Sequence, residues 1–544
     1  MLFHLVLVPI LIAVLLYLFP SSRIARILVV ISQAAMVYFS VNLFSITRET
    51  AVVAAMGNFR GGLGILLKAD SLSSVFIVIT TFVFFTAAIY SFYENNDKLF
   101  WFLLFVWEGL LLGIFLTNDL FNIFVLVEVA TVVVAVLIMF YRGSRSMYDG
   151  MVYLMINVVV IQFYLFGLGY LYKLTGALDI DMVGEAAKTL DRSSLILPYA
   201  LIMTAVSLKC AFIPLYSWLP RAHGTPGAPS SVSAILSGLH IKGGLYLFIR
   251  FQTLFSDAAL PEFFIVVGII TGIGGFVKAL SQSDIKRILA FSTISQIGLI
   301  TIGLNIADTY TFTGSLYHIF NHSMFKSALF LSAGMISHVY GTRNIDKIRG
   351  LFRVNPMVGS ATIMAIFGIT GVPMFNGSIS KYFMVSGTNW LVSAAIIFIN
   401  LGTITVFIRY SMMLFGQPEV KSKAVHTAVY QNDRRKVDRR RVDSFRQISV
   451  FLLGVLCFIS GIFGEDFIQL LFNIQVSVDP AGFLEKAALF GGSLIAGLLI
   501  VKYYVPESTL LKRINAADLN FRGMCISIGV FFAVILITLN VFPS

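Results

Sequence analysis

The apolar segment LILPYALIMTAVSLKCAFIPLYSWL (residues 195–219) is long enough to cross a lipid bilayer, and Lys209 lies near its middle. Placing a lysine in hydrocarbon costs roughly 2.5–3.5 kcal/mol on insertion scales. Pro214 follows inside the segment, and Pro220 comes directly after it. Because proline removes a helical hydrogen bond, we expect the helix to open beside the lysine, leaving backbone groups free to bind water or ions. The segment therefore predicts a membrane helix that is broken at a buried charge.

The rest of the chain is equally apolar. Of its 544 residues 58% are hydrophobic and 12% are charged, and the mean hydropathy is +0.88. This composition excludes a soluble protein and predicts an all-α polytopic membrane protein. The first apolar run has no basic segment before it and no cleavage site, so we interpret it as a retained span. We predict sixteen spans, at about 3–20, 27–45, 72–93, 100–117, 120–141, 150–172, 195–219, 229–250, 262–280, 288–305, 312–337, 355–386, 389–415, 448–471, 487–505 and 523–541.

The net charge of +12 is distributed unevenly among the loops. Most Lys and Arg residues fall in alternate loops, and the segment 418–446 carries the run RRKVDRRR (residues 434–441). The positive-inside rule places these loops in the cytoplasm, so both termini are predicted to lie outside a cell membrane. This placement argues against a nucleic-acid partner, and we interpret the segment 418–446 as a solvated loop that sets topology rather than as a specific binding site.

A second broken helix is predicted at Lys381, because Gly371 and Pro373 precede it in the same apolar run. The broken spans are the seventh and the twelfth. Interrupted helices in corresponding positions indicate inverted repeats around a site at the middle of the membrane. We therefore divide the chain into N-terminal spans (1–98), a first five-helix repeat (99–254), a second repeat (255–417), the basic linker (418–446) and C-terminal spans (447–544).

Further ionisable residues lie within other apolar runs. Glu128 is near the centre of the fifth span, and Lys242 is midway along the eighth. His318, His322 and Lys326 recur every four residues in the eleventh span and so form one polar stripe on a helix. Glu108 in the fourth span is a second intramembrane acid. Buried Glu, Lys and His residues in membrane spans mark ion and proton pathways, whereas a static ion pair between helices is the structural alternative.

Four stretches in order resemble one family. They are KCAFIPLYSWLPRAHGTPGAPSSVSAILSGLHIKGGLY (209–246), SDIKRILAFSTISQIG (283–298), HIFNHSMFKSALFLSAG (318–334) and GVPMFNGSISK (371–381). Together they resemble the antiporter-like subunits that are shared by respiratory complex I, Mrp-type Na+/H+ antiporters and membrane-bound energy-converting hydrogenases. The resemblance covers roughly residues 70 to 415. It implies a core of about fourteen helices with inverted repeats, to which this chain adds about two C-terminal spans.

The resemblance also implies ion-pumping roles for Glu128, Lys209, Lys242, the pair His322 and Lys326, and Lys381. Two positions depart from many relatives. Arg221 stands where many have an acid, and Lys381 stands where one class of complex I subunit has glutamate. The family works in rows of similar subunits, and Lys381 has no acid at the matching position of its own half. We therefore expect Lys381 to lie near an interface and to face a carboxylate of a neighbouring subunit.

These observations predict a subunit that moves protons or cations and carries no redox centre of its own. The sequence contains no CxxC, HExxH or GxxxxGK[ST] motif, so we expect neither a metal nor a cofactor, and any electron transfer would occur in partner subunits. The complex is predicted to be of the hydrogenase or quinone-oxidoreductase type. An Mrp-type Na+/H+ antiporter subunit, a non-conducting scaffold subunit and a small-solute symporter are the alternatives.

Overall fold

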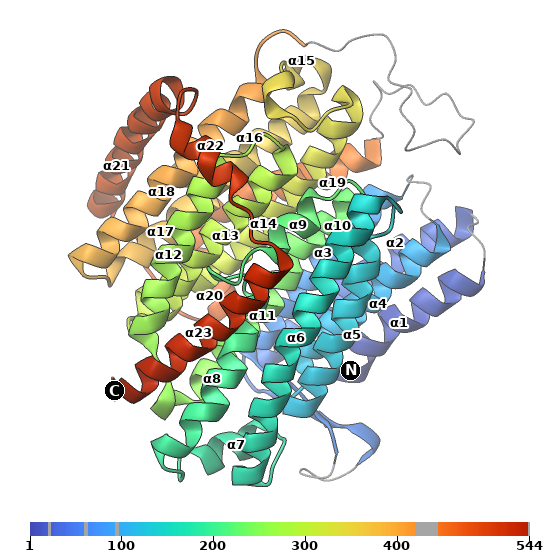
Figure 1. Ribbon diagram of the computed structural model, residues 1–544. Helices are drawn as coiled ribbons and strands as arrows, with labels where there is room; N and C mark the ends of the chain where they lie inside the picture. Colours follow the sequence, from blue (N-terminus) through green and yellow to red (C-terminus); the bar gives the residue numbers. More distant parts are fainter. Residues whose placement is uncertain (20–22, 59–63, 93–96, 419–443, 542–544) are drawn as a thin grey trace.

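The computed structural model describes the chain except for residues 20–22, 59–63, 93–96, 419–443 and 542–544, and it is a bundle of helices (Figure 1). In the described part, twelve helices are long and apolar enough to cross a membrane, and α1 (Leu2–Leu18) and α16 (Pro356–Thr370) are shorter apolar helices. The strands there are β1 (Val52–Ala55) and β2 (Leu66–Ala69), which pair antiparallel. The prediction of an all-α polytopic membrane protein is confirmed. The basic linker lies almost wholly outside the described residues.

Helices occupy each of the sixteen predicted spans. The N-terminal spans are α1, α2 (Arg23–Thr47) and α3 (Ser71–Ser91). The next group contains α4 (Lys98–Leu116), α5 (Leu120–Ile138), α6 (Ser144–Thr175), α7 (Ile180–Ala187), α8 (Arg192–Lys209), α9 (Trp218–Gly224), α10 (Ser230–Ile235), a π-helical turn η2 (Leu236–His240) and α11 (Ile241–Leu254). The following group contains α12 (Pro261–Leu280), α13 (Ile285–Leu304), α14 (Thr309–Tyr340), α15 (Leu351–Val354), α16, α17 (Asn376–Ser386) and α18 (Trp390–Ser411).

The two groups share features at a constant spacing. Helices α6 and α14 each have 32 residues, and each is followed by a glycine with positive φ, Gly176 and Gly341. The aspartates that cap α5 and α13, Asp119 and Asp284, each form a β-bridge to the residue three positions beyond that glycine. In every such pair the second member follows the first by 165 residues. This spacing supports the two repeats, while their boundaries stay a prediction.

Both broken helices end in the same way. In the first break, between α8 and α9, Ala211 has a φ of 55°, and in the second, between α16 and α17, Gly371 has a φ of 81°. In each, the amide of the next residue bonds to the carbonyl five residues back, which satisfies an end carbonyl of the helix. Pro214 and Pro373 lie within the breaks. Pro220 was expected to help break the seventh span, but it is the third residue of α9 and lies beyond the break.

The eighth span is tied to the start of α3 by an ion pair. Asp70 caps α3 by accepting a bond from the Ser73 amide, and Arg250 of α11 donates to both Asp70 oxygens at 2.6 and 2.7 Å. Burial alone would raise the pKa of the Asp70 carboxyl, but Arg250 and the Ser73 bonds outweigh it and lower the pKa.

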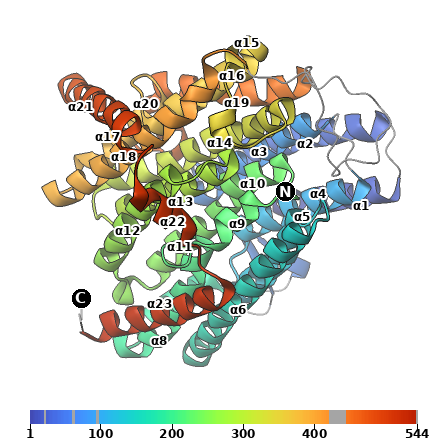
Figure 2. The same cartoon turned by 45° about the horizontal axis from the view of Figure 1, so that its top comes forward.

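The last two C-terminal spans pack on different sides of the bundle rather than next to each other. After α19 (Ser444–Ile462) and α20 (Gly464–Phe472), α21 (Pro480–Leu499) packs on α18, and α23 (Phe521–Val541) packs on α8 and α6. The short helix α22 (Thr509–Ala516) joins them past α12, as both views show (Figures 1 and 2). The extension therefore links the outer faces of both groups.

Charged contacts fix α22 and the residues after it. Lys278 of α12 donates to the Ile514 carbonyl at 2.8 Å, Arg287 pairs with Asp518 at 2.8 Å, and Arg221 donates to the Leu519 carbonyl at 2.8 Å. Arg221, which was noted as a departure from many relatives, therefore binds the C-terminal extension.

Candidate functional site

Lys209 is the last residue of α8, and the break places its side chain among polar groups of two other helices. Its ammonium donates to the Asn157 side-chain oxygen of α6 at 2.8 Å and to the Thr131 hydroxyl of α5 at 2.9 Å. Gly244 of α11 lies against the Lys209 backbone, where a Cβ would approach within 2.8 Å of the carbonyl carbon. The absent side chain thus lets α11 pack directly on the break.

Glu128 lies one helical turn before Thr131 on α5 and is half-buried. Its charge interacts with that of Lys209, but the two groups form no ion pair within 4 Å, and the Glu128 Oε2 atom is buried without a protein partner. The expected Glu–Lys pair is therefore separated in this conformation, and Lys209 is held by neutral oxygens instead. Breaking a direct pair is not required before either group can exchange a proton.

A polar connection leads from Lys209 toward the eighth span. The Tyr153 hydroxyl of α6 interacts with the Thr131 hydroxyl and lies 3.2 Å from His240 Nε2. The Trp107 indole lies 3.4 Å from the other nitrogen of the same ring. Since Tyr and His both donate and accept hydrogen bonds, these groups can pass a proton along the connection.

The buried ionisable residues His240 and Lys242 of the eighth span lie on opposite sides of it. His240 faces Tyr153 in the first group, whereas Lys242 bonds to His322 Nδ1 of α14 and donates to the Ser237 carbonyl at 2.7 Å. The chain between them passes from the π-helical turn η2 into α11, and such turns are frequent at functional sites. Lys242 thus joins the ionisable residues of the first group of helices to those of the second.

The His–His–Lys stripe of α14 is completely buried, but its three members have different partners. His322 contacts Lys242. His318 lies 2.8 Å from the Ser380 hydroxyl and 3.0 Å from the Gln296 side-chain oxygen. Lys326 donates to the Ser292 hydroxyl at 2.5 Å and to the Leu289 carbonyl. The stripe therefore branches, with His318 directed toward α17 and Lys326 toward α13.

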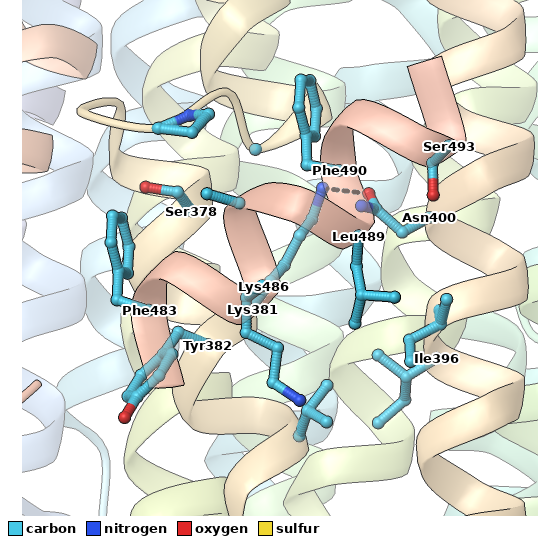
Figure 3. A pocket seen from close by; sticks show the side chains of 15 residues that line it. Ser378, Lys381, Tyr382, Ile396, Asn400, Phe483, Lys486, Leu489, Phe490 and Ser493 are labelled. Atoms are coloured by element: carbon cyan, nitrogen blue, oxygen red, sulfur yellow. Dashed lines mark hydrogen bonds between the residues drawn. The ribbon is translucent and has the colours of Figure 1, made fainter. Parts of the chain in front are cut away.

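Lys381 lies beside the second break, in a small cavity of about 80 Å³ at the edge of the bundle. Its ammonium donates to the Asn400 side-chain oxygen of α18 at 2.7 Å (Figure 3) and to the Ile369 carbonyl at 2.5 Å. Residues of α21 line the near side of the same cavity, including Phe483 and Lys486 (Figure 3). Helix α21 therefore stands between Lys381 and whatever lies beside that face.

Glu108 is fully buried on α4 and accepts a hydrogen bond of 2.6 Å from the Gln33 side chain of α2. No described contact joins Glu108 to Glu128 or Lys209, so the structure places this acid apart from the other predicted residues. Its second oxygen, Oε1, has no protein partner.

The central lysines lack counter-ions within the described residues. None of Lys209, Lys242, Lys326 and Lys381 takes part in an ion pair there. No cluster of His, Cys, Asp and Glu in that part of the chain could hold a metal ion either. Each ammonium instead donates hydrogen bonds to carbonyl, hydroxyl, amide or imidazole groups. Because these partners are not carboxylates, a lysine can lose its proton without leaving an unpaired negative charge beside it.

Sequence reasoning missed the uncharged residues that form hydrogen bonds with the buried lysines and histidines. For Asn157 and Tyr153 a signal existed, because adding the repeat spacing of 165 to their positions gives His322 and His318. The others carry no such signal in the sequence, since polar uncharged residues are common in membrane helices and a lone histidine is often a core residue. They are Thr131, Ser237, His240, Ser292, Gln296, Ser380 and Asn400.

Comparison with known proteins identifies the family. Residues 117–408 match the family described as NADH:quinone oxidoreductase/Mrp antiporter, transmembrane. The chain belongs to this family. It is an antiporter-like membrane subunit, as its motifs predicted.

The relatives include subunits of Na(+)/H(+) antiporters and of NADH-quinone oxidoreductases. The chain is 28% identical to the D subunit of the Na(+)/H(+) antiporter of Alkalihalophilus pseudofirmus over 70% of its length and 78% of that protein. It is 29% identical to the N subunit of the NADH-quinone oxidoreductase of Desulforudis audaxviator over 75% of its length and 83% of that protein.

The fold matches two solved assemblies. A chain of the Mrp complex from Dietzia sp. DQ12-45-1b aligns with a TM-score of 0.77 at 21% identity, covering 94% of this chain and 99% of that one. A chain of the membrane-bound sulfane sulfur reductase, an archaeal respiratory membrane complex, aligns with the same score and identity, covering 92% and 99%.

Proposed function

We propose that this protein is the proton-translocating subunit of a multisubunit energy-converting complex in the cell membrane. The observation that carries the proposal is the row of buried groups across the bundle, from Glu128 and Lys209 through Lys242 and His322 to Lys381. Intramembrane ionisable residues are costly and mark ion pathways. A scaffold subunit would not need lysines beside both helix breaks.

The contacts support a sequence of transfers. A proton that reaches Glu128 passes to Lys209, and Thr131, Tyr153 and His240 carry it to the eighth span, where Lys242 lies two residues beyond His240 on the opposite side. From there the bond to His322 leads into the second group of helices. The His322 Nε2 atom is buried without a protein partner, and such atoms bind ordered water in relays. Transfer onward to Lys381 would run along this side of α14.

The groups in the row favour H+ over Na+ as the ion that crosses the centre. Hard cations take oxygen ligands, whereas the central groups here are amines and imidazoles that repel a cation when protonated. An Mrp-type Na+/H+ antiporter subunit is the second candidate, and the similarity to the antiporter protein of Alkalihalophilus pseudofirmus favours it. In that case Na+ would cross elsewhere in the complex, or at the carboxylates Glu108 and Glu128.

The proposal includes the orientation and the neighbours. The N-terminal end of α1 and the C-terminal end of α23 lie toward the same side of the bundle, opposite α15 and α22 (Figure 1). This arrangement agrees with an even number of spans. We place that side outside, as the loop charges predict. Lys381 would hand protons to a carboxylate of the adjacent subunit at the face that α21 partly covers.

The experiment is proton uptake by inside-out vesicles that contain the complex. Lys209→Ala and Glu128→Gln should each abolish or strongly reduce uptake while the complex still assembles, because the first removes the proton acceptor and the second keeps the shape but cannot ionise. Assembly lost in both variants would support the static ion-pair alternative. Uptake near wild type in both would refute the proposal. If the complex is an Mrp-type antiporter, Na+ added outside the vesicles should cause them to release protons. A pump that does not carry Na+ should show no such release.

A further inference from the structure

A large cavity opens on the membrane face of the bundle, away from the buried charges. It has a volume of about 710 Å³ and lies between α2, α3, α14, α19 and α20. This volume falls within the range of small-molecule sites, about 300–1,000 Å³. Its walls are formed almost wholly by apolar side chains, which are Val37, Val41 and Phe44 of α2, Val78, Ile79 and Phe82 of α3, Phe320 and Met324 of α14, Leu456 of α19, and Phe467, Leu470 and Leu471 of α20.

The polar residues of the cavity gather at one end. Ser45, Arg48, Glu49 and Asn473 line it there, at the ends of α2 and α20. Arg48 and Glu49 are exposed, and neither takes part in an ion pair within the described residues. A cation and an anion thus stand side by side at the mouth of an apolar groove.

The depth of the groove matches one leaflet of a bilayer. Along α2 the lining runs from Val37 to Arg48, which is about 16 Å at 1.5 Å per residue. Half of the hydrocarbon core of a bilayer is about 15 Å thick. The charged end therefore lies where lipid headgroups begin, and the apolar end lies near the middle of the membrane.

The groove suits an acyl chain better than a helix of a partner subunit, because its walls are apolar and the charged residues that line it stand together at one end. An acyl chain is narrower and has no backbone polar groups to satisfy. An apolar groove within the hydrocarbon of a bilayer excludes water. A lipid chain is therefore the occupant that fits.

We propose that this groove is a specific site for one zwitterionic phospholipid, such as phosphatidylethanolamine, in the leaflet next to the β1–β2 hairpin. Arg48 would bind the phosphate and Glu49 the ammonium of the headgroup, because guanidinium and carboxylate groups form charge-assisted hydrogen bonds with these partners. The acyl chain would fill the groove down to Phe320 and Met324.

The lipid would pack behind the relay helix. Phe320 and Met324 alternate along α14 with His318, His322 and Lys326, and so they lie on the other side of the helix. Phe320 is 7% exposed and Met324 is completely buried, so the cavity reaches the body of α14. A chain bound here would separate the buried histidines from the surrounding bilayer by one layer of apolar contacts.

Native mass spectrometry of the complex in mild detergent, titrated with phosphatidylethanolamine, tests the site. Wild type should retain one tightly bound lipid. Arg48→Gln should weaken its binding about tenfold, as expected for loss of a charged hydrogen-bond partner. Val41→Trp should abolish binding by filling the groove, since Val41 is 45% exposed along it. The control Ile46→Trp, at an exposed position of α2 outside the groove, should bind as wild type does.

Two further comparisons make the result decisive. Wild type should prefer phosphatidylethanolamine to phosphatidylglycerol, which has no ammonium, and Glu49→Gln should remove that preference. Equal lipid retention by Val41→Trp and by wild type would overturn the proposal. So would crosslinking of Val41→Cys to another subunit in the assembled complex, because a protein segment would then fill the groove.

Discussion

Asn157 is the residue whose replacement tests most sharply how Lys209 is held. The variant Asn157→Leu keeps the volume of the side chain but removes the oxygen that lies 2.8 Å from the Lys209 ammonium. Asn157 is only 1% exposed, so water cannot replace the lost acceptor without reorganising the helices. A hydrogen bond to a charged group is worth about 1.5–3 kcal/mol. Charging Lys209 should therefore cost about 1.5–3 kcal/mol more, which reduces the charged population about ten- to hundredfold.

The assay is proton uptake by reconstituted vesicles, followed with a pH-sensitive dye under a fixed driving reaction. Because every translocated proton passes through charged Lys209, uptake should fall at least about tenfold. Asn157→Asp, which restores an oxygen acceptor, should recover much of the rate. The matched control is Gln162→Leu, since among the described residues the Gln162 amide on the same helix bonds only to the Val158 carbonyl.

An uptake rate within twofold of wild type in Asn157→Leu would show that Asn157 does not stabilise the charged lysine. A fall of the same size in Gln162→Leu would indicate a general effect on α6 packing. Loss of the complex from the membrane in Asn157→Leu, with no recovery in Asn157→Asp, would assign Asn157 a structural role only.

Three further predictions concern the rest of the chain. Asp518→Asn should loosen α22 and speed amide hydrogen exchange there. The free energy of unfolding should fall by only about 0.5–1 kcal/mol, because the Asp518–Arg287 pair is partly exposed. Unchanged exchange would show that this ion pair does not hold α22 in place. The lowered pKa of Asp70 means that its pairing with Arg250 stabilises the protein above the ordinary value of 3.8 and is lost as the pH falls through the lower folded value. The melting temperature should therefore drop at acidic pH in wild type and less in Asp70→Asn; equal drops would refute this. Cysteine labelling should reach the segment 418–446 from the cytoplasm and residue 544 from outside; labelling of residue 544 from inside would correct the span count.

Much of the fold could be predicted because membrane spans are fixed by local composition. Runs of apolar residues marked sixteen segments that are all helical in the structure, and Gly371, Pro214 and Pro373 marked where two of them open. Pro220 misled us, since proline is also accommodated in the first turn of a helix, and here it lies in the first turn of α9 rather than at the end of α8.

The candidate site was less predictable because its contacts join distant parts of the chain. The buried lysines were evident as charges in hydrocarbon, but their partners depend on which helix faces lie together. Asn157 was the exception, as the 165-residue spacing aligns it with His322. The separation of Glu128 from Lys209 could not be foreseen, because it depends on Asn157 and Thr131 competing for the ammonium.

The course of the C-terminal extension also lay beyond the sequence. Its two apolar runs predicted spans but not their positions, since any lipid-facing surface would accept them. The structure sends α21 to α18 and α23 to α8, and charged contacts at Arg221 and Arg287 fix the connection between them. In the sequence, Arg287 appeared only as a loop charge and Arg221 only as a departure from many relatives.

The most direct test of the central claim is the number of protons moved per turnover by a complex that carries Lys242→Met. Lys242 is the residue that connects the two groups of helices through His322, and methionine keeps the unbranched apolar length of the side chain. If protons pass along the buried row, an assembled complex with this variant should move almost no protons through this subunit. A wild-type number of protons per turnover would contradict the account.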